Sequence, residues 1–83
     1  MQFKVGQVTH YYDKIGVAIV ELDADLATGD EVKFVRGGED LFKQKVESMQ
    51  VEHEKVDSAK KGDVVGLKTK KEVKEGAEVF KLQ

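Results

Sequence analysis

The sequence predicts a compact all-β barrel of six or seven short strands, and three observations support this fold class. Apolar residues mostly recur at every second position, which is the spacing of strands. Glycine-containing turns separate the apolar stretches, and no capped, helix-length pattern occurs. The chain has 83 residues, of which 40% are hydrophobic, so it is expected to form one domain, residues 1–83.

The first half of the chain is expected to contain three strands. Residues 4–12 are rich in β-branched and aromatic residues, which predicts a strand. A tight turn at Asp13-Lys14 then leads to residues 15–22, a nearly continuous apolar run. Such a run indicates either a strand covered on both faces or a short buried helix, and its β-branched content favours the strand. Residues 31–36 form the third predicted strand.

The second half repeats this organisation. Residues 42–51 alternate between apolar and polar, but the apolar positions change parity along the run. This change predicts a β-bulge near residues 47–49, which would bend the strand as a closed barrel requires. Further strands are predicted at residues 64–68 and 78–82.

Two aspartates, Asp30 and Asp63, each follow a turn glycine. We expect their carboxylates to accept hydrogen bonds from backbone N–H groups of their own turns. The alternative is a carboxylate pair that performs acid–base chemistry.

The sequence offers no recognisable catalytic or cofactor motif. It has no cysteine, no phosphate-binding glycine loop and no H-E-x-x-H motif, so we expect a protein that is not an enzyme and has no cofactor. The two histidines, His10 and His53, are expected at strand ends on the surface. The alternative, a metal shared with Glu52 or Glu54, lacks the evident ligand spacing of a metal site, and we therefore predict no metal.

The composition indicates a soluble, cytoplasmic protein. No apolar run approaches the roughly 18 residues of a membrane span, and the N-terminus lacks the apolar stretch of a signal peptide. A Lys- and Glu-rich sequence without cysteine or asparagine fits a thermophile. The formal net charge of −2 argues against a generic polyanion binder but not against a local basic patch.

A local excess of positive charge lies between residues 60 and 74, a segment that contains six lysines and two carboxylates. Such a patch can follow a phosphate backbone, whereas the alternative is a solvated loop. At the end of the first predicted strand, at least one aromatic residue is expected to be exposed. It could stack on bases or anchor a protein, whereas the alternative is a tyrosine packed across the hairpin. The candidate nucleic-acid-binding residues are Lys60, Lys61, Lys68, Lys70, Lys71, Lys74, Tyr11 and Tyr12.

Four segments together resemble the second domain of translational GTPases such as elongation factor Tu. They are Leu26-Ala27-Thr28-Gly29-Asp30-Glu31-Val32, Val46-Glu47-Ser48-Met49-Gln50, the segment 56–67 and the segment 73–79. The resemblance implies a closed, antiparallel Greek-key barrel, the translation-protein barrel, which contacts ribosomal RNA and tRNA in the full factors. Since this chain carries no GTPase domain, it looks most like the stand-alone translation elongation factor-like proteins.

A similar barrel occurs as the accessory C-terminal domain of the collagenase-type U32 peptidases, where Val5-Gly6-x-Val8 and Gly29-Asp30-Glu31-Val32 would fit. The first hypothesis is therefore a non-catalytic module of protein biosynthesis that binds tRNA or rRNA through its lysines. The alternative is a protein-interaction domain that acts with a separately encoded enzyme such as a U32-type peptidase. Neither hypothesis involves a membrane or a nucleotide cofactor.

Overall fold

A computed structural model describes residues 2–82 of the chain. This part consists of strands and connecting turns, so it contains no helix that could cross a membrane. The strands are β1 (Gln2–Tyr12), β2 (Val17–Leu22), β3 (Leu26–Ala27), β4 (Glu31–Arg36), β5 (Glu39–Lys45), β6 (Met49–Val51), β7 (Glu54–Val56), β8 (Ser58–Ala59), β9 (Val64–Lys68) and β10 (Glu78–Leu82).

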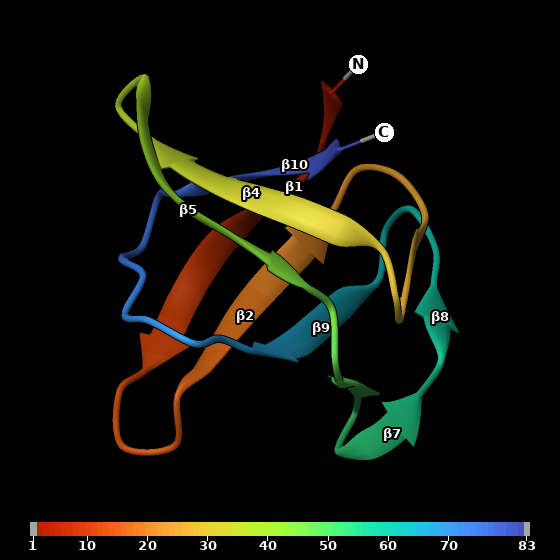
Figure 1. Cartoon of the computed structure of the whole chain (residues 1–83). Helices are drawn as coiled ribbons and strands as arrows, with labels where there is room; N and C mark the ends of the chain where they lie inside the picture. The colour runs from red at the N-terminus through yellow and green to blue at the C-terminus, as the bar shows by residue number, and fades with distance from the viewer. Residues whose placement is uncertain (1, 83) are drawn as a thin grey trace.

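Eight of these strands form one curved sheet in the order β5-β4-β10-β1-β2-β9-β6-β7, and β3 pairs with β8 separately. Figure 1 shows the β4–β5 hairpin passing in front of β1 and β2 as the sheet curls. The strand pairs are antiparallel, which confirms the predicted all-β antiparallel class. The predicted closed barrel is wrong, because no backbone pairing joins the edge strands β5 and β7 within residues 2–82.

The sheet stays open because the predicted strand at residues 42–51 is interrupted after Lys45. Val46 leaves the ladder and exchanges backbone hydrogen bonds with a neighbouring turn: its N–H donates to Asp30 O at 2.8 Å, and its carbonyl accepts from Gly29 N at 2.9 Å. β5 therefore pairs with β4, whereas β6 pairs with β7 and β9. The bulge predicted near residues 47–49 is accordingly wrong, since the ladder breaks there.

A buried side chain bridges the opening instead of a backbone ladder. Gln44 on β5 donates from Nε2 to Lys68 O at 2.8 Å, and its Oε1 accepts from Lys70 N at 2.8 Å. The side-chain amide thus offers one donor and one acceptor, as a peptide group in a neighbouring strand would. Because Gln44 is only 6% exposed, both bonds satisfy polar atoms that water barely reaches.

Most strands lie where the sequence predicts them. β4, β9 and β10 match the predicted ranges, and β1 contains its predicted strand. β2 begins later than expected, because residues 13–16 form a longer turn than the predicted two-residue connection. Gly16, with φ of 66°, closes this turn by donating to Tyr12 O at 2.9 Å. The short strands β3, β7 and β8 were not predicted.

Three turns share one backbone arrangement, with Gly29, Gly62 and Gly76 at φ of 93°, 93° and 89°. In the first two, a carboxylate accepts from the residue three positions earlier. Asp30 Oδ2 lies 2.9 Å from Ala27 N, and Asp63 Oδ2 lies 2.9 Å from Lys60 N. The predicted role of these aspartates in their own turns is confirmed.

The enclosed face of the sheet holds the hydrophobic core. Phe34 on β4 is fully buried and packs against Phe42 on β5 with ring centroids 4.9 Å apart. On β2 the inward residues Ala18, Val20 and Leu22 are buried, whereas the residues between them face away from the core. Burial of one face only leaves the outer face of β2 free to form a surface site.

Candidate functional site

An apolar groove of about 260 Å³ lies on the outer side of the sheet and is formed by β2, β9, β6 and the two turns beside them. Its lining residues are Tyr12, Ile15, Val17, Ile19, Gln50, Glu52, His53, Val64, Val65 and Gly66. Three of them are large and strongly exposed: Tyr12 by 49%, Ile15 by 58% and Val64 by 51%. Apolar side chains gathered around a concave surface are typical of a binding site rather than of scattered surface hydrophobics.

The groove follows from the continuous apolar run that forms β2. The sequence predicts a strand covered on both faces, but the protein covers only the inner one. The outward residues Val17 and Ile19 are left half-buried in the groove. Sequence reasoning did not select these residues as a site, although the run of apolar residues without alternation was the available signal.

A glycine in the middle of β9 forms part of the groove. Gly66 pairs with Ile19 on one side and with Gln50 on the other, so it lies between two side chains of neighbouring strands. A Cβ atom at Gly66 would lie 3.2 Å from Val17 Cγ1 and 3.7 Å from Ile19 Cδ1. Glycine inside a strand commonly marks a close approach of another group, and here that group is the side chain of Val17.

The turn between β6 and β7 contributes the polar end of the groove. Val51 pairs with Glu54, so Glu52 and His53 form a two-residue connection, with φ of 52° and 68°. Such connections favour Asn-Gly, because other residues resist the left-handed conformation. The cost is roughly 1–2 kcal/mol for each non-glycine residue. Two strained residues thus place a carboxylate and an imidazole beside apolar side chains.

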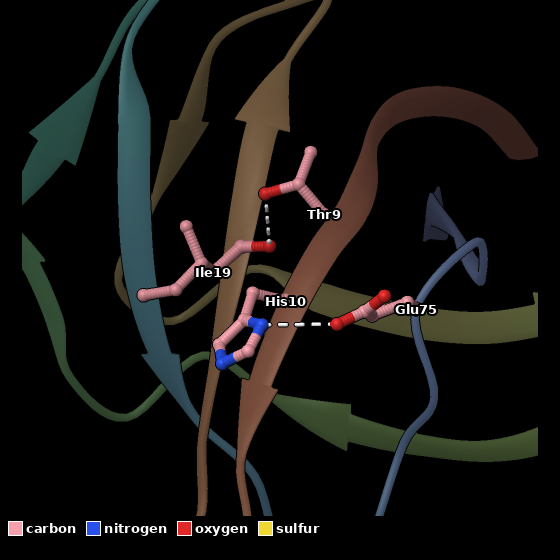
Figure 2. Close-up of polar contacts among 4 residues, drawn as sticks. All are labelled: Thr9, His10, Ile19 and Glu75. Atoms are coloured by element: carbon pink, nitrogen blue, oxygen red, sulfur yellow. Dashed lines mark hydrogen bonds and ion pairs between the residues drawn. The ribbon is translucent and has the colours of Figure 1, made fainter.

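A second, more open depression of about 410 Å³ is polar. Figure 2 shows His10 on β1 directed toward Glu75, and the His10 Nδ1 to Glu75 Oε2 distance is 2.9 Å. Arg36 Nε donates to the carbonyl of Glu75 at 3.3 Å. The remaining lining residues carry both charge signs, so this depression favours neither a cation nor an anion; they are Tyr11, Asp13, Glu72, Val73 and Lys74.

The six predicted lysines are all exposed, but they do not form one patch. Lys60 and Lys61 lie before β9, whereas Lys68 ends that strand. From Val64 to Lys68 alone, β9 extends about 13 Å at the usual rise per residue. The structure therefore divides the lysines between the two ends of β9. Lys70 lies 3.9 Å from Glu47, which partly offsets its charge.

The two predicted tyrosines point to different sites. Tyr11 is half-buried, packs against the core and lines the polar depression together with Lys74. Tyr12 lines the apolar groove, and its ring lies edge-on to His10 with centroids 4.4 Å apart. Only Tyr12 is thus placed at the apolar groove.

The two histidines also belong to different sites. His10 contacts Glu75, whereas His53 lines the groove. Among residues 2–82, no group of three or more His, Asp or Glu side chains could hold a metal ion.

The fold and the groove define a small antiparallel β domain with an apolar surface cleft. Residues 2–77 match the peptidase family U32 C-terminal domain, and the chain belongs to this family of domains. It is 37% identical, over 82 residues, to an uncharacterized protease of Methanocaldococcus jannaschii. That match covers 99% of this chain and 20% of the relative, so the chain spans about a fifth of the length of this relative.

Two solved structures have the same fold. Both are crystal structures of the C-terminal domain of a Geobacillus thermoleovorans protein described as a U32 peptidase, one of them a selenomethionine variant. The selenomethionine variant superposes with a TM-score of 0.86 at 25% identity and covers 93% of this chain and 96% of that one. The other gives 0.88 at 26% identity, covering 96% and 92%.

These matches overturn the predicted identity. The chain is not a stand-alone translation elongation factor-like protein, and the prediction of a role in protein biosynthesis is wrong, because its relatives are U32 peptidase domains. The RNA-binding hypothesis that depended on this resemblance is not supported. The alternative, an accessory domain of the U32 type, agrees with the family match.

Proposed function

We propose that this domain is a non-catalytic docking module for a U32-type peptidase, and that its apolar groove binds the remaining part of the peptidase. The groove could bind a peptidase region of the same polypeptide or one that is encoded separately. The observation that carries the proposal is the groove itself, where three large apolar side chains gather at one site.

The dimensions of the groove suit a side chain of a protein. Its volume of about 260 Å³ lies just below the roughly 300–1,000 Å³ of pockets that enclose small ligands. Large apolar side chains that enter a well-packed pocket supply much of the affinity of protein interfaces. A groove of this size accommodates such an anchor within a broader contact.

The match to the M. jannaschii relative supports a peptidase as the partner. This domain corresponds to a fifth of that protein, which leaves four-fifths outside the match. A domain that belongs to a peptidase family and exposes an apolar groove is best explained if the rest of such a peptidase covers the groove.

Site-specific crosslinking tests the proposal, because the chain has no cysteine and one introduced thiol is unique. Val64→Cys and the control Leu41→Cys, each carrying a photo-crosslinker, are mixed with the M. jannaschii relative from which the matching fifth has been deleted. Leu41 is 38% exposed and lies outside the groove. Circular dichroism first establishes that the truncated relative is folded.

We expect a crosslink from position 64 that Ile15→Lys abolishes, and little from position 41. Equal crosslinking from both positions, or none from position 64, would reject the groove as the docking surface.

A further inference from the structure

We infer that the groove recognises a polypeptide segment with a large apolar side chain next to a basic one. The apolar side chain enters the groove beside Val17 and Ile19, and the basic side chain binds Glu52. This inference rests on the proposed docking function and states which chemistry the partner segment must carry.

The groove fits an apolar side chain because the groups on its β2 side are apolar. Val17 and Ile19 are half-buried there, and Ile15 and Val64 stand at the rim. Gly66 has no positive φ, so its backbone conformation does not require glycine. The absence of a side chain instead lets Val17 pack closely over this position, and the backbone of Gly66 lines the groove beside it.

The charge of the groove selects the neighbouring residue of the partner. Among the lining residues, Glu52 is the one carboxylate, and none is a lysine or an arginine. Glu52 is exposed, so solvent and salt screen its attraction for a cation, and the charge preference that it gives is modest. An acidic segment would meet repulsion at the same place, so the groove discriminates by charge.

The strained turn gives independent support. Glu52 and His53 both adopt the left-handed conformation at positions where glycine or asparagine would be favourable. Strain of this kind tends to occur where a side chain is needed for binding. Replacing His53 by glycine should therefore raise the urea midpoint of unfolding, since it relieves the strain while it removes the imidazole.

Chemical-shift titrations with three blocked peptides test the inference on the intact chain. The probes are acetyl-Lys-Phe-Lys-amide, acetyl-Glu-Phe-Glu-amide and acetyl-Lys-Ser-Lys-amide. We expect the first to shift the amides of Glu52, Val64 and Gly66 in a saturable manner. The acidic peptide should bind at least about fivefold more weakly, and the serine peptide should produce no saturable shift. The charge preference should shrink between about 50 and 500 mM salt.

A pair of isosteric variants isolates the carboxylate. Glu52→Gln should remove the preference for the basic peptide and retain the need for phenylalanine. Glu54→Gln, which neutralises the next carboxylate outside the groove lining, should leave the preference unchanged.

The outcomes separate this inference from the docking function. If Val64 crosslinks to the peptidase but the peptides bind without charge preference, or if Glu52→Gln changes nothing, the inference is overturned and docking stands. If position 64 gives no crosslink to the peptidase, the docking proposal is rejected, and the inference that rests on it is rejected with it.

Discussion

The turns at Gly29 and Gly62 have nearly the same backbone as the turn at Gly76, yet they are held by different side chains. In each turn, the glycine N–H donates to the carbonyl of a buried residue, and the N–H of that residue donates to the carbonyl of the residue after the glycine. The buried partners are Val46, Leu22 and Val8, and the six bonds measure 2.7–2.9 Å. Asp30 and Asp63 add a carboxylate bond within the turn, but Ala77 cannot.

The third turn is instead supported from outside. The carboxylate of Glu75 contacts His10, and the backbone carbonyl of Glu75 accepts a hydrogen bond from Arg36. The difference has a physical cause, because Ala77 is fully buried whereas Asp30 and Asp63 are not. The comparison teaches that glycine and the paired backbone bonds define the turn, while burial decides which side chains can reinforce it.

Placing a carboxylate at the third turn should have the largest effect. Ala77→Asp would allow a bond to Lys74 N, but it would bury a charge at a site with no exposure. We expect the free energy of unfolding to fall by about 3 kcal/mol or more, measured by urea denaturation. Ala77→Asn is the neutral control and should cost less. Wild-type stability in Ala77→Asp would show that burial does not distinguish the turns.

Removing the turn glycines should have the next largest effect and should be nearly uniform. No heavy atom lies within 4 Å of a Cβ built at Gly29, Gly62 or Gly76, so substitution strains only the backbone. We expect Gly→Ala at each position to cost about 1–2 kcal/mol of unfolding free energy. A cost at Gly76 far below the other two would mean that external support makes the glycine conformation unnecessary there.

These turns also show which features of the fold could be predicted from the sequence. Alternation located β9 correctly, because one buried face imposes a period of two. The predicted ranges of β4 and β10 were also correct, although four consecutive residues of β4 are buried. The Gly-Asp motifs correctly indicated turns, but they did not distinguish the translation-factor domain from the U32 domain, since Gly29-Asp30 fitted both. Their residues satisfy a local backbone requirement, which the third turn meets with Gly76-Ala77 instead.

The remaining features depend on contacts between distant residues. The open sheet results from Val46 leaving its strand to bond with the Gly29 turn, which no local pattern reveals. The bridge by Gln44 is likewise invisible in a sequence where that residue resembles any polar strand position. The groove required knowing that the outer face of β2 stays uncovered, although the apolar run had already marked it.

The two aspartates should differ in strength. Asp30 Oδ2 also lies 3.2 Å from Lys81 Nζ, and both side chains are less than a quarter exposed. We expect Asp30→Ala to cost about 2 kcal/mol and Asp63→Ala about 1 kcal/mol in unfolding free energy. Lys81→Met should reduce the cost of losing Asp30 toward that of Asp63. Equal costs for the two aspartates in the wild-type background would show that the Asp30–Lys81 ion pair does not add to the stability of the turn.

The external support of the third turn should have the smallest effect. His10 is 49% exposed and Glu75 63%, so solvent screens their interaction. We expect a double-mutant cycle with His10→Gln and Glu75→Gln to give a coupling below about 1 kcal/mol, decreasing as salt is raised. A larger coupling would make this pair equivalent to the carboxylates of the other turns. A small coupling leaves Gly76 and the bonds that Val8 makes with Gly76 and Ala77 as the main determinants of the third turn, where side-chain reinforcement is then secondary.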